Sequence, residues 1–357
     1  MRIAIVIGSL GYGGAERFCV DLANALTQKG CYVTLISLSN NVPLRHKLND
    51  SVKLVCLNHH KILKFLDIIM LSNLFIRDHI QVVDTHLFAS NIYGRIAAFL
   101  ARVPVIVTHE HTLTPWKKWY HRILELILSR ITDKIICISK IVALNRIQAE
   151  KICTSKIVLI PIGIDIKMLN FSKSVNDYTI GFIGRFVPAK NIPMLIEVYH
   201  HVQRELPCVK LLLIGDGPMR SHIEKLIHLK GLNDKVVITG FVNNVEKYIE
   251  KISVLVLTSI REGTPVSVLE AMAAGIPPVT VQVGALPEII KDGENGFLVR
   301  PYDIERMSDL IVKLLADRRL RRKLGMNARK TALKYDITKI ADRTVKLYEG
   351  ILRKKRI

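Results

Sequence analysis

Residues 178–191 read YTIGFIGRFVPAKN. The apolar run over 178–184 is typical of a buried strand that enters a glycine turn, and residues 192–206 after it have helical periodicity. The first residues of the chain, MRIAIVIGSLGYGG, have the same organisation. A strand series that restarts midway predicts two domains, each built around its own parallel sheet.

Short apolar runs alternate with amphipathic stretches along the whole chain, which predicts parallel sheets covered by helices on both faces. Predicted strands are 3–7, 33–36, 82–84, 105–108, 134–138, 157–160, 179–183, 210–214, 236–239, 254–257 and 278–280. The predicted fold class is α/β, with two doubly wound, Rossmann-like domains facing a cleft. Ligands are expected at the carboxyl ends of the strands, beside that cleft.

The length of 357 residues suits two domains of roughly 170 residues each. We predict an N-terminal domain over 1–170 and a C-terminal domain over 178–335. The polar stretch 165–177, which has no periodicity, is the predicted linker. A last helix within 336–357 is expected to cross back to the N-terminal domain.

Composition narrows the classes of partner. The net charge of +21 indicates nucleic acid, an anionic membrane surface or an acidic substrate. No pair of the six cysteines has C-x-x-C spacing, so neither a zinc site nor a disulfide framework is expected. No apolar window approaches the ~18–20 residues that span a bilayer, and a cytoplasmic location is expected.

Glycines and cations mark the turns after both first strands. Four glycines in 8–14 allow backbone N–H groups of a first turn to approach an anion, with the positive end of a helix behind them. In the second turn, Arg185 and Lys190 lie where a strand ends and a helix begins. Together they suit a pyrophosphate, since guanidinium forks across oxygens and ammonium acts as a point charge.

The segment REGTPVSVLEAMAAG at 261–275 follows the predicted strand 254–257. Pro265 is suited to the first position of a helix, and the free N–H groups at such a start bind phosphate. Glu262 precedes this helix and Glu270 lies about two turns along it. Two carboxylates so spaced suit hydroxyl groups of a sugar and of a ribose, although spacing alone also fits a helix with a solvated glutamate.

The motifs, taken in order, resemble a known family. Residues 262–270 have an E-x7-E pattern, and the chain also contains GGAER at 13–17, GR…K at 184–190, LLIGDGP at 212–218, TGFV at 239–242, LEAMAAGIPPV at 269–279 and PEIIKDGENGFLV at 287–299. This series is similar to that of the retaining GT-B glycosyltransferases, particularly glycosyltransferase family 4. The resemblance covers nearly the whole chain and is strongest over 178–300.

The resemblance implies roles for single residues. Arg185 and Lys190 would bind the donor diphosphate, Glu262 would contact the donor sugar, and Glu270 would hold the ribose. Other residues implied in donor binding approach the phosphates or border the nucleobase, and they are Gly13, Gly14, Gly215, Phe241, Val242, Gly263, Thr264 and Pro265.

The family also has a histidine after a strand of the N-terminal domain. The segment Thr108-His109-Glu110-His111 offers two candidates, of which His109 is favoured and His111 is second. Two histidines flanking a glutamate also suit a metal ion. No metal or other cofactor is expected, because a third ligand is not evident from the sequence and the family needs no catalytic ion.

The predicted function is retaining transfer of a sugar from a nucleotide-diphosphate sugar to a saccharide acceptor, in cell-surface polysaccharide or glycolipid biosynthesis. Basic and aromatic residues mix over 115–122, before the apolar stretch 123–128, which favours an anionic membrane surface and a lipid-linked acceptor. A surface helix packed on the sheet explains the same pattern.

Two rival functions remain. A sugar-nucleotide epimerase shares the two-domain fold, and a basic non-enzymatic nucleic-acid-binding protein is favoured by charge alone. The sequence identifies neither the donor sugar and base nor the acceptor, the linkage or the oligomeric state.

Overall fold

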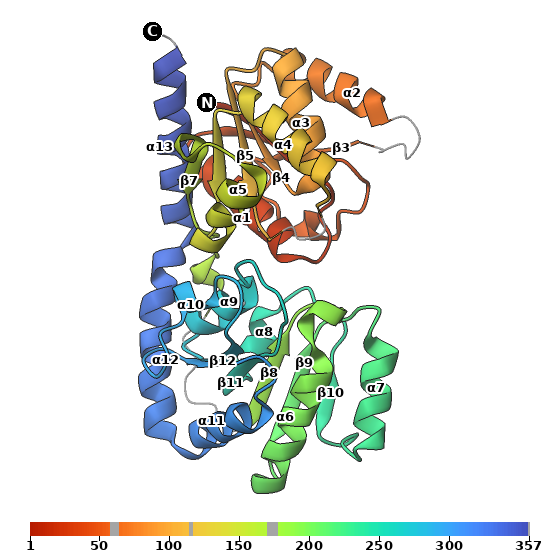
Figure 1. Ribbon diagram of the computed structural model, residues 1–357, viewed down its shortest axis with the longest axis vertical. Helices are drawn as coiled ribbons and strands as arrows, with labels where there is room; N and C mark the ends of the chain where they lie inside the picture. Colours follow the sequence, from red (N-terminus) through yellow and green to blue (C-terminus); the bar gives the residue numbers. More distant parts are fainter. Residues whose placement is uncertain (58–63, 114–116, 170–177, 356–357) are drawn as a thin grey trace. The chain divides into compact units, whose positions relative to one another are not determined.

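The computed structural model describes residues 1–57, 64–113, 117–169 and 178–355. They form two compact units (Figure 1). The first unit comprises Met1–Gly163 together with the C-terminal helix α13 (Ile337–Lys355), and the second comprises Ile164–Asp336. The second unit is therefore inserted between two parts of the first.

The first unit is built on a seven-stranded sheet of order β3-β2-β1-β4-β5-β6-β7, in which every pairing between described strands is parallel. Its strands are β1 (Arg2–Ile7), β2 (Tyr32–Ser37), β3 (Lys53–Cys56), β4 (Val82–His86), β5 (Val105–Glu110), β6 (Lys134–Cys137) and β7 (Ile157–Leu159). Its helices are α1 (Gly14–Gln28), α2 (Lys64–Arg77), α3 (Phe88–Leu100), α4 (Trp119–Ile131), α5 (Lys140–Glu150) and α13, with short 3-10 turns η1 (Pro43–Lys47) and η2 (Thr154–Lys156). Strand order reverses between β1 and β4, where such sheets bind ligands.

The second unit repeats this arrangement in a six-stranded parallel sheet of order β10-β9-β8-β11-β12-β13, and its order reverses between β8 and β11. Its strands are β8 (Thr179–Ile183), β9 (Lys210–Ile214), β10 (Val236–Ile238), β11 (Val254–Leu257), β12 (Pro278–Val281) and β13 (Phe297–Val299). Its helices are α6 (Ile192–Glu205), α7 (Arg220–Leu229), α8 (Glu246–Ile249), α9 (Val266–Ala273), α10 (Leu286–Ile289), α11 (Ile304–Ala316) and α12 (Arg318–Ala332), with η3 (Ile166–Met168), η4 (Pro188–Lys190) and η5 (Leu333–Tyr335).

The prediction of two parallel-sheet α/β domains is confirmed. Each predicted strand falls on a strand of the structure, and β3 and β13 are additional. Most of the predicted linker, residues 170–177, lies outside the described residues, whereas η3 already belongs to the second unit.

Helix α13 completes the core of the first unit. It packs against α1 and β5, and the fully buried Tyr348 donates a hydrogen bond to the carboxylate of Asp84 in β4. Val83, the neighbour of Asp84, faces the cluster that α2 and α3 cover. Since successive strand residues point to opposite faces, α13 covers the other face of the sheet.

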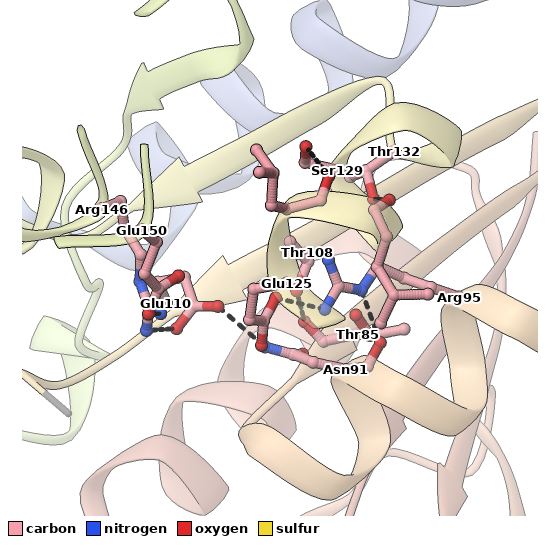
Figure 2. A network of polar contacts seen from close by, with 12 residues as sticks. Thr85, Asn91, Arg95, Thr108, Glu110, Glu125, Ser129, Thr132, Arg146 and Glu150 are labelled. Carbon is pink, nitrogen blue, oxygen red and sulfur yellow. Dashed lines mark hydrogen bonds and ion pairs between the residues drawn. The ribbon is translucent and has the colours of Figure 1, made fainter. Parts of the chain in front are cut away.

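Six buried charged side chains of the first unit form one network, and Figure 2 labels five of them: Arg95, Glu110, Glu125, Arg146 and Glu150. Glu125 of α4 accepts hydrogen bonds from Arg95 of α3 at 2.6 Å and from Lys117 at 3.0 Å. Lys117 also donates to Glu150 at 3.1 Å, and Arg146 contacts both Glu150 and Glu110 at the end of β5. Three cations and three carboxylates thus join α3, α4 and α5 to the end of β5.

Opposite charges decide the ionisation of Glu125. Burial raises the pKa of this carboxyl, but the nearby charges of Arg95 and Lys117 outweigh burial and lower the pKa to about 2. Because this value is below the ordinary value of 4.5, the charge of Glu125 stabilises the folded protein fully above about pH 4.5. That stabilisation is lost as the pH falls toward 2.

Replacing Glu125 with glutamine should lower the free energy of unfolding by about 3 kcal/mol at pH 7, because Arg95 and Lys117 would lose a buried counter-charge. Urea unfolding followed by tryptophan fluorescence measures this, since both tryptophans belong to the chain of the first unit. The exposed Glu349→Gln change in α13 is the control, and it should stay within about 0.5 kcal/mol of wild type. An E125Q deficit that does not shrink between pH 5 and pH 3 would contradict the assigned ionisation.

Candidate functional site

The turn after β8 places two cations differently. Gly184 donates a hydrogen bond from its amide to Ile214 at 3.0 Å, and the ring of Phe186 is fully buried. Arg185, between them, is exposed. Lys190 ends the short turn η4, and Asn191 after it has a left-handed backbone with φ +47°. The turn is therefore anchored by its apolar residue and leaves the guanidinium to solvent.

A glycine loop after β9 lies directly against this turn. Gly215 has φ +140°, and a Cβ atom there would lie 2.0 Å from the carbonyl oxygen of Gly184. The amide of Phe186 also donates to the carbonyl of Asp216 at 2.8 Å. Only glycine fits at 215, because both the backbone angle and the close approach exclude a side chain.

The second turn of the site precedes α9. Gly263, Thr264 and Pro265 are all buried, and Pro265 caps the helix, which begins one residue later than the sequence predicted. The Thr264 hydroxyl has no hydrogen-bond partner among the described residues. Gly284 has φ +57°, and a Cβ there would lie 2.1 Å from the carbonyl oxygen of Glu262. Backbone packing thus fixes the start of α9.

An ion pair joins the two turns. Lys190 Nζ lies 2.6 Å from Glu262 Oε1, although the residues are 72 positions apart. The Thr258 hydroxyl donates to the carbonyls of Lys190 at 3.1 Å and Asn191 at 3.0 Å. The amide of Ile260 donates to the carbonyl of Ala189 at 2.8 Å. Two segments predicted to share a diphosphate are therefore adjacent within the second unit.

The remaining predicted residues of the second unit lie on neighbouring elements. Glu270 is buried in α9. Gly215 donates its amide to the carbonyl of Gly240 at 3.1 Å, which places Phe241 and Val242 just beyond that contact. The Phe241 ring is 47% exposed. The structure thus gathers these residues at the carboxyl ends of β8 to β11.

Gly13 and Gly14 lie in the first unit, between β1 and α1. Gly13 caps α1 and donates its amide to Gly11 at 3.0 Å, and Gly14 is the first residue of the helix. A Cβ at Gly13 would lie 2.2 Å from the Glu16 carboxylate. The Glu16 carboxylate therefore lies against this helix start, and anion binding at Gly13 and Gly14 stays a prediction.

Three histidines lie at the carboxyl ends of β4 and β5. His109 is fully buried, and its Nδ1 lies 2.8 Å from Asp84 Oδ1. His111 follows β5, is 5% exposed, and has its Nε2 2.9 Å from Nδ1 of His86. The rings of His86 and His109 stack, with centroids 4.4 Å apart, and Phe18 packs against all three.

The neighbours of His111 determine which of its ring nitrogens carries the proton. Burial lowers the pKa of both His86 and His111, so both rings are neutral near pH 7. His86 Nε2 lies 3.4 Å from Asp84 Oδ2, and the carboxylate favours the proton on that nitrogen. His86 Nδ1 then accepts from His111 Nε2, which leaves His111 Nδ1 as a hydrogen-bond acceptor. His109, bonded at Nδ1, has its free nitrogen enclosed.

The sequence did not identify Asp84 and His86 as site residues. Ligand atoms of Asp84, His86 and His109 lie within 4.8 Å of one another, a spacing that suits a metal ion. A third ligand for His109 and His111 was not evident from the sequence, and the structure groups Asp84 and His86 with His109 instead. The signal was the VVDTH run of β4, whose His86 is in register with His109 of β5.

One residue of the basic and aromatic segment 115–122 is not on the surface that the sequence predicted. Residues 115 and 116 lie outside the described residues. Lys117, expected to contribute to a basic surface, is instead buried between Glu125 and Glu150. The correction follows from tertiary contacts, since two carboxylates from separate helices provide the counter-charge.

Two family profiles match consecutive parts of the chain. The profile for Glycosyltransferase Family 4 matches residues 12–167, and the profile for Glycosyl transferases group 1 matches residues 166–331. The matches meet close to the boundary between the two units.

Individual relatives match nearly the whole chain or about half of it. It is 25% identical, over 94% of its length and 93% of the relative's, to the UDP-Gal:alpha-D-GlcNAc-diphosphoundecaprenol alpha-1,3-galactosyltransferase of Escherichia coli. It is 32% identical, over 48% of its length and 35% of the relative's, to the poly(ribitol-phosphate) alpha-N-acetylglucosaminyltransferase of Staphylococcus aureus. The crystal structure of HepE from Anabaena in complex with UDP and glucose has the same fold, with a TM-score of 0.86, 20% identity, and coverage of 98% of this chain and 100% of that one.

Replacing Gly215 with alanine should destabilise the second unit by about 3 kcal/mol, because the new methyl group would overlap the Gly184 carbonyl and the backbone angle disfavours a side chain. Gly231→Ala is the matched control, since Gly231 has φ +65° but open space around it, and should cost about 1 kcal/mol. Thermal unfolding followed by circular dichroism compares the two. Equal losses of stability in the two variants would show that the close approach of residue 215 to Gly184 does not contribute to the cost.

Proposed function

Because the chain belongs to the GT-B glycosyltransferases of family 4, we propose that it is a retaining enzyme that transfers a sugar from a nucleoside-diphosphate sugar to a lipid-linked saccharide. Two similar proteins support this assignment. The Escherichia coli relative is named for a UDP-linked donor and a diphosphoundecaprenol acceptor, and the HepE structure holds UDP and glucose. The biosynthesis of a cell-surface polysaccharide or glycolipid is the corresponding process.

The Lys190–Glu262 pair is the observation that carries the proposal. Lys190 neutralises Glu262 at 2.6 Å, with 19% and 9% of the two side chains exposed. A diphosphate carries more charge than one carboxylate and attracts the ammonium more strongly. Lys190 then turns to the diphosphate, and Glu262 becomes free to accept hydrogen bonds from the sugar hydroxyls.

The other donor contacts extend from this pair. The exposed Arg185 forks across diphosphate oxygens, and the first N–H groups of α9 point at the same charge. Glu270 accepts the ribose hydroxyls, and Phe241 borders the base. In the first unit, His111 or His109 and the helix start at Gly13 serve the sugar and the phosphates.

The reaction is a substitution at the anomeric carbon of the donor sugar. The bond from this carbon to the diphosphate breaks with its electron pair, and the acceptor oxygen forms a new bond on the same face. The acceptor proton moves to the departing phosphate oxygen, so charge and atoms balance. Fixed cations and helix N–H groups stabilise the negative charge that develops on the diphosphate.

We infer that the histidine cluster works without a metal ion or other cofactor. Asp84 already accepts hydrogen bonds from His109 and Tyr348, and His86 is bonded to His111. A metal would have to displace these partners in a fully buried position.

The enzyme is further proposed to act at the cytoplasmic face of the cell membrane, where a lipid-linked acceptor is presented. Among the described residues, no helix is both long and apolar enough to cross a bilayer. We propose that a surface of the folded protein makes the attachment.

A thermal-shift screen with UDP-, GDP-, ADP- and dTDP-sugars tests the donor assignment. A specific donor at about 100 times its Kd should stabilise the protein by about 2.7 kcal/mol, by mass action. Product analysis without acceptor separates the alternatives, because an epimerase releases a new nucleotide sugar whereas a transferase does not. Tight binding of a random oligonucleotide with no response to any nucleotide sugar would reject the proposal.

Replacing Lys190 with alanine should lower kcat by about 100-fold, the scale of losing one donor that stabilises developing charge. Steady-state rates at saturating donor measure the change. Lys291→Ala is the control, because this lysine of the same unit is 75% exposed and is expected to leave kcat unaltered. Wild-type turnover in a folded K190A enzyme is incompatible with the diphosphate role.

A further inference from the structure

Helix α4 of the first unit exposes large apolar residues. Its one carboxylate, Glu125, is 3% exposed, held inside by Arg95 and Lys117. Leu128 is buried beside it, but Trp119 is 72% exposed, Ile123 49% and Ile127 53%. A helix that faces only water exposes polar residues instead, because apolar area in contact with water is unfavourable.

Helix α2 repeats the pattern. Its only carboxylate, Asp67, is 1% exposed, while Phe65, Ile69 and Ile76 are between 48% and 58% exposed. Helix α3 has no acidic residue and ends in the exposed pair Phe99 and Leu100.

The three helices are neighbours on one side of the sheet. Helix α2 packs on α3, and α3 packs on α4 (Figure 1). We name the exposed surface of these helices the α2–α4 face. Its large apolar side chains are Phe65, Ile69, Met70, Ile76, Phe99, Leu100, Trp119, Tyr120, Ile123, Leu126 and Ile127. So many exposed large apolar side chains on three neighbouring helices are typical of an interaction site.

The charges on this face have one sign. Lys118 at the start of α4, and Arg122 and Arg130 within it, are exposed. No carboxylate is exposed on α2, α3 or α4, since the two that these helices contain are both buried. The partner that complements the face is therefore apolar in its interior and anionic at its surface.

We propose that the α2–α4 face is the surface by which the protein docks on a bilayer that contains anionic lipids. The apolar side chains enter the boundary between headgroups and acyl chains, and the arginines contact lipid phosphates. Trp119 and Tyr120 are suited to this boundary, because each ring has an apolar body and a polar edge. This inference adds the surface of attachment to the proposed function. It rests on that function only in that a lipid-linked acceptor gives the enzyme a reason to bind the membrane.

The buried ion network gives the face its stiffness. Glu125, Lys117 and Arg95 fix α4 to α3 and to the segment before α4. The outward direction of Trp119, Ile123 and Ile127 is thus a property of the folded unit and does not depend on contact with lipid.

Sedimentation with vesicles tests the surface directly. Wild-type protein should bind vesicles of phosphatidylglycerol and phosphatidylethanolamine, and not vesicles of phosphatidylcholine alone. The triple variant Trp119→Ser, Ile123→Ser, Ile127→Ser should bind about tenfold or more weakly, because three apolar side chains no longer enter the interface. The double variant Arg122→Gln, Arg130→Gln should lose the preference for anionic lipid.

Matched control changes are available in the second unit. Leu229 and Val237 are 79% and 53% exposed, and replacing both with serine should leave vesicle binding unchanged. Quenching of wild-type tryptophan fluorescence by brominated lipids gives a second measurement that needs no variant, and quenching by anionic vesicles is expected.

Three results would overturn the proposal. They are absence of vesicle binding by wild-type protein, equal binding by the triple variant, or a concentration-dependent dimer that the triple variant abolishes, which would assign the face to self-association. Transfer to a soluble acceptor analogue should be equal in wild type and the triple variant. Vesicle binding without any sugar transfer would reject the proposed function and leave the docking surface standing.

Discussion

The central position of β8 is the constraint on which the candidate donor site depends. This strand is hydrogen-bonded to β9 on one side and to β11 on the other, and all three run parallel. The turns that follow them therefore leave the sheet at the same edge. Lys190 and Glu262 meet for this reason, and the glycines at 215 and 284 allow the backbones around them to approach. Chemistry at this edge follows from strand order more than from any single residue.

Much of this fold follows from periodicity and turn composition, because parallel strands buried on both faces are nearly continuous apolar runs. The strands that the sequence did not reveal are short: β3 has four residues with exposed ends, and β13 has three. Asp84 and His86 were missed for a different reason. Their partners come from β5 and α13, and neither strand order nor the position of a distant helix is readable from spacing within β4. Lys117 was misplaced likewise, since its counter-charges come from separate helices.

Burial also redistributes charge in the first unit. Among its described residues, five carboxylates are buried, namely Asp67, Asp84, Glu110, Glu125 and Glu150, against three buried cations, Arg95, Lys117 and Arg146. The surface is consequently more basic than composition alone indicates. The composition shows that the net charge is positive. The structure shows which cations are exposed and which of them lie beside exposed apolar side chains.

The bond between Tyr348 and Asp84 joins residues 264 positions apart. During translation, the sheet that contains Asp84 emerges first, and a helix that packs on one of its faces follows only after the second unit. The inserted second unit is made in between and has all of its own strands before that helix exists. The sheet that is synthesised first is therefore completed only after the inserted unit has been made, and until then α1 covers this face without its neighbour α13, which leaves apolar surface for chaperones to protect.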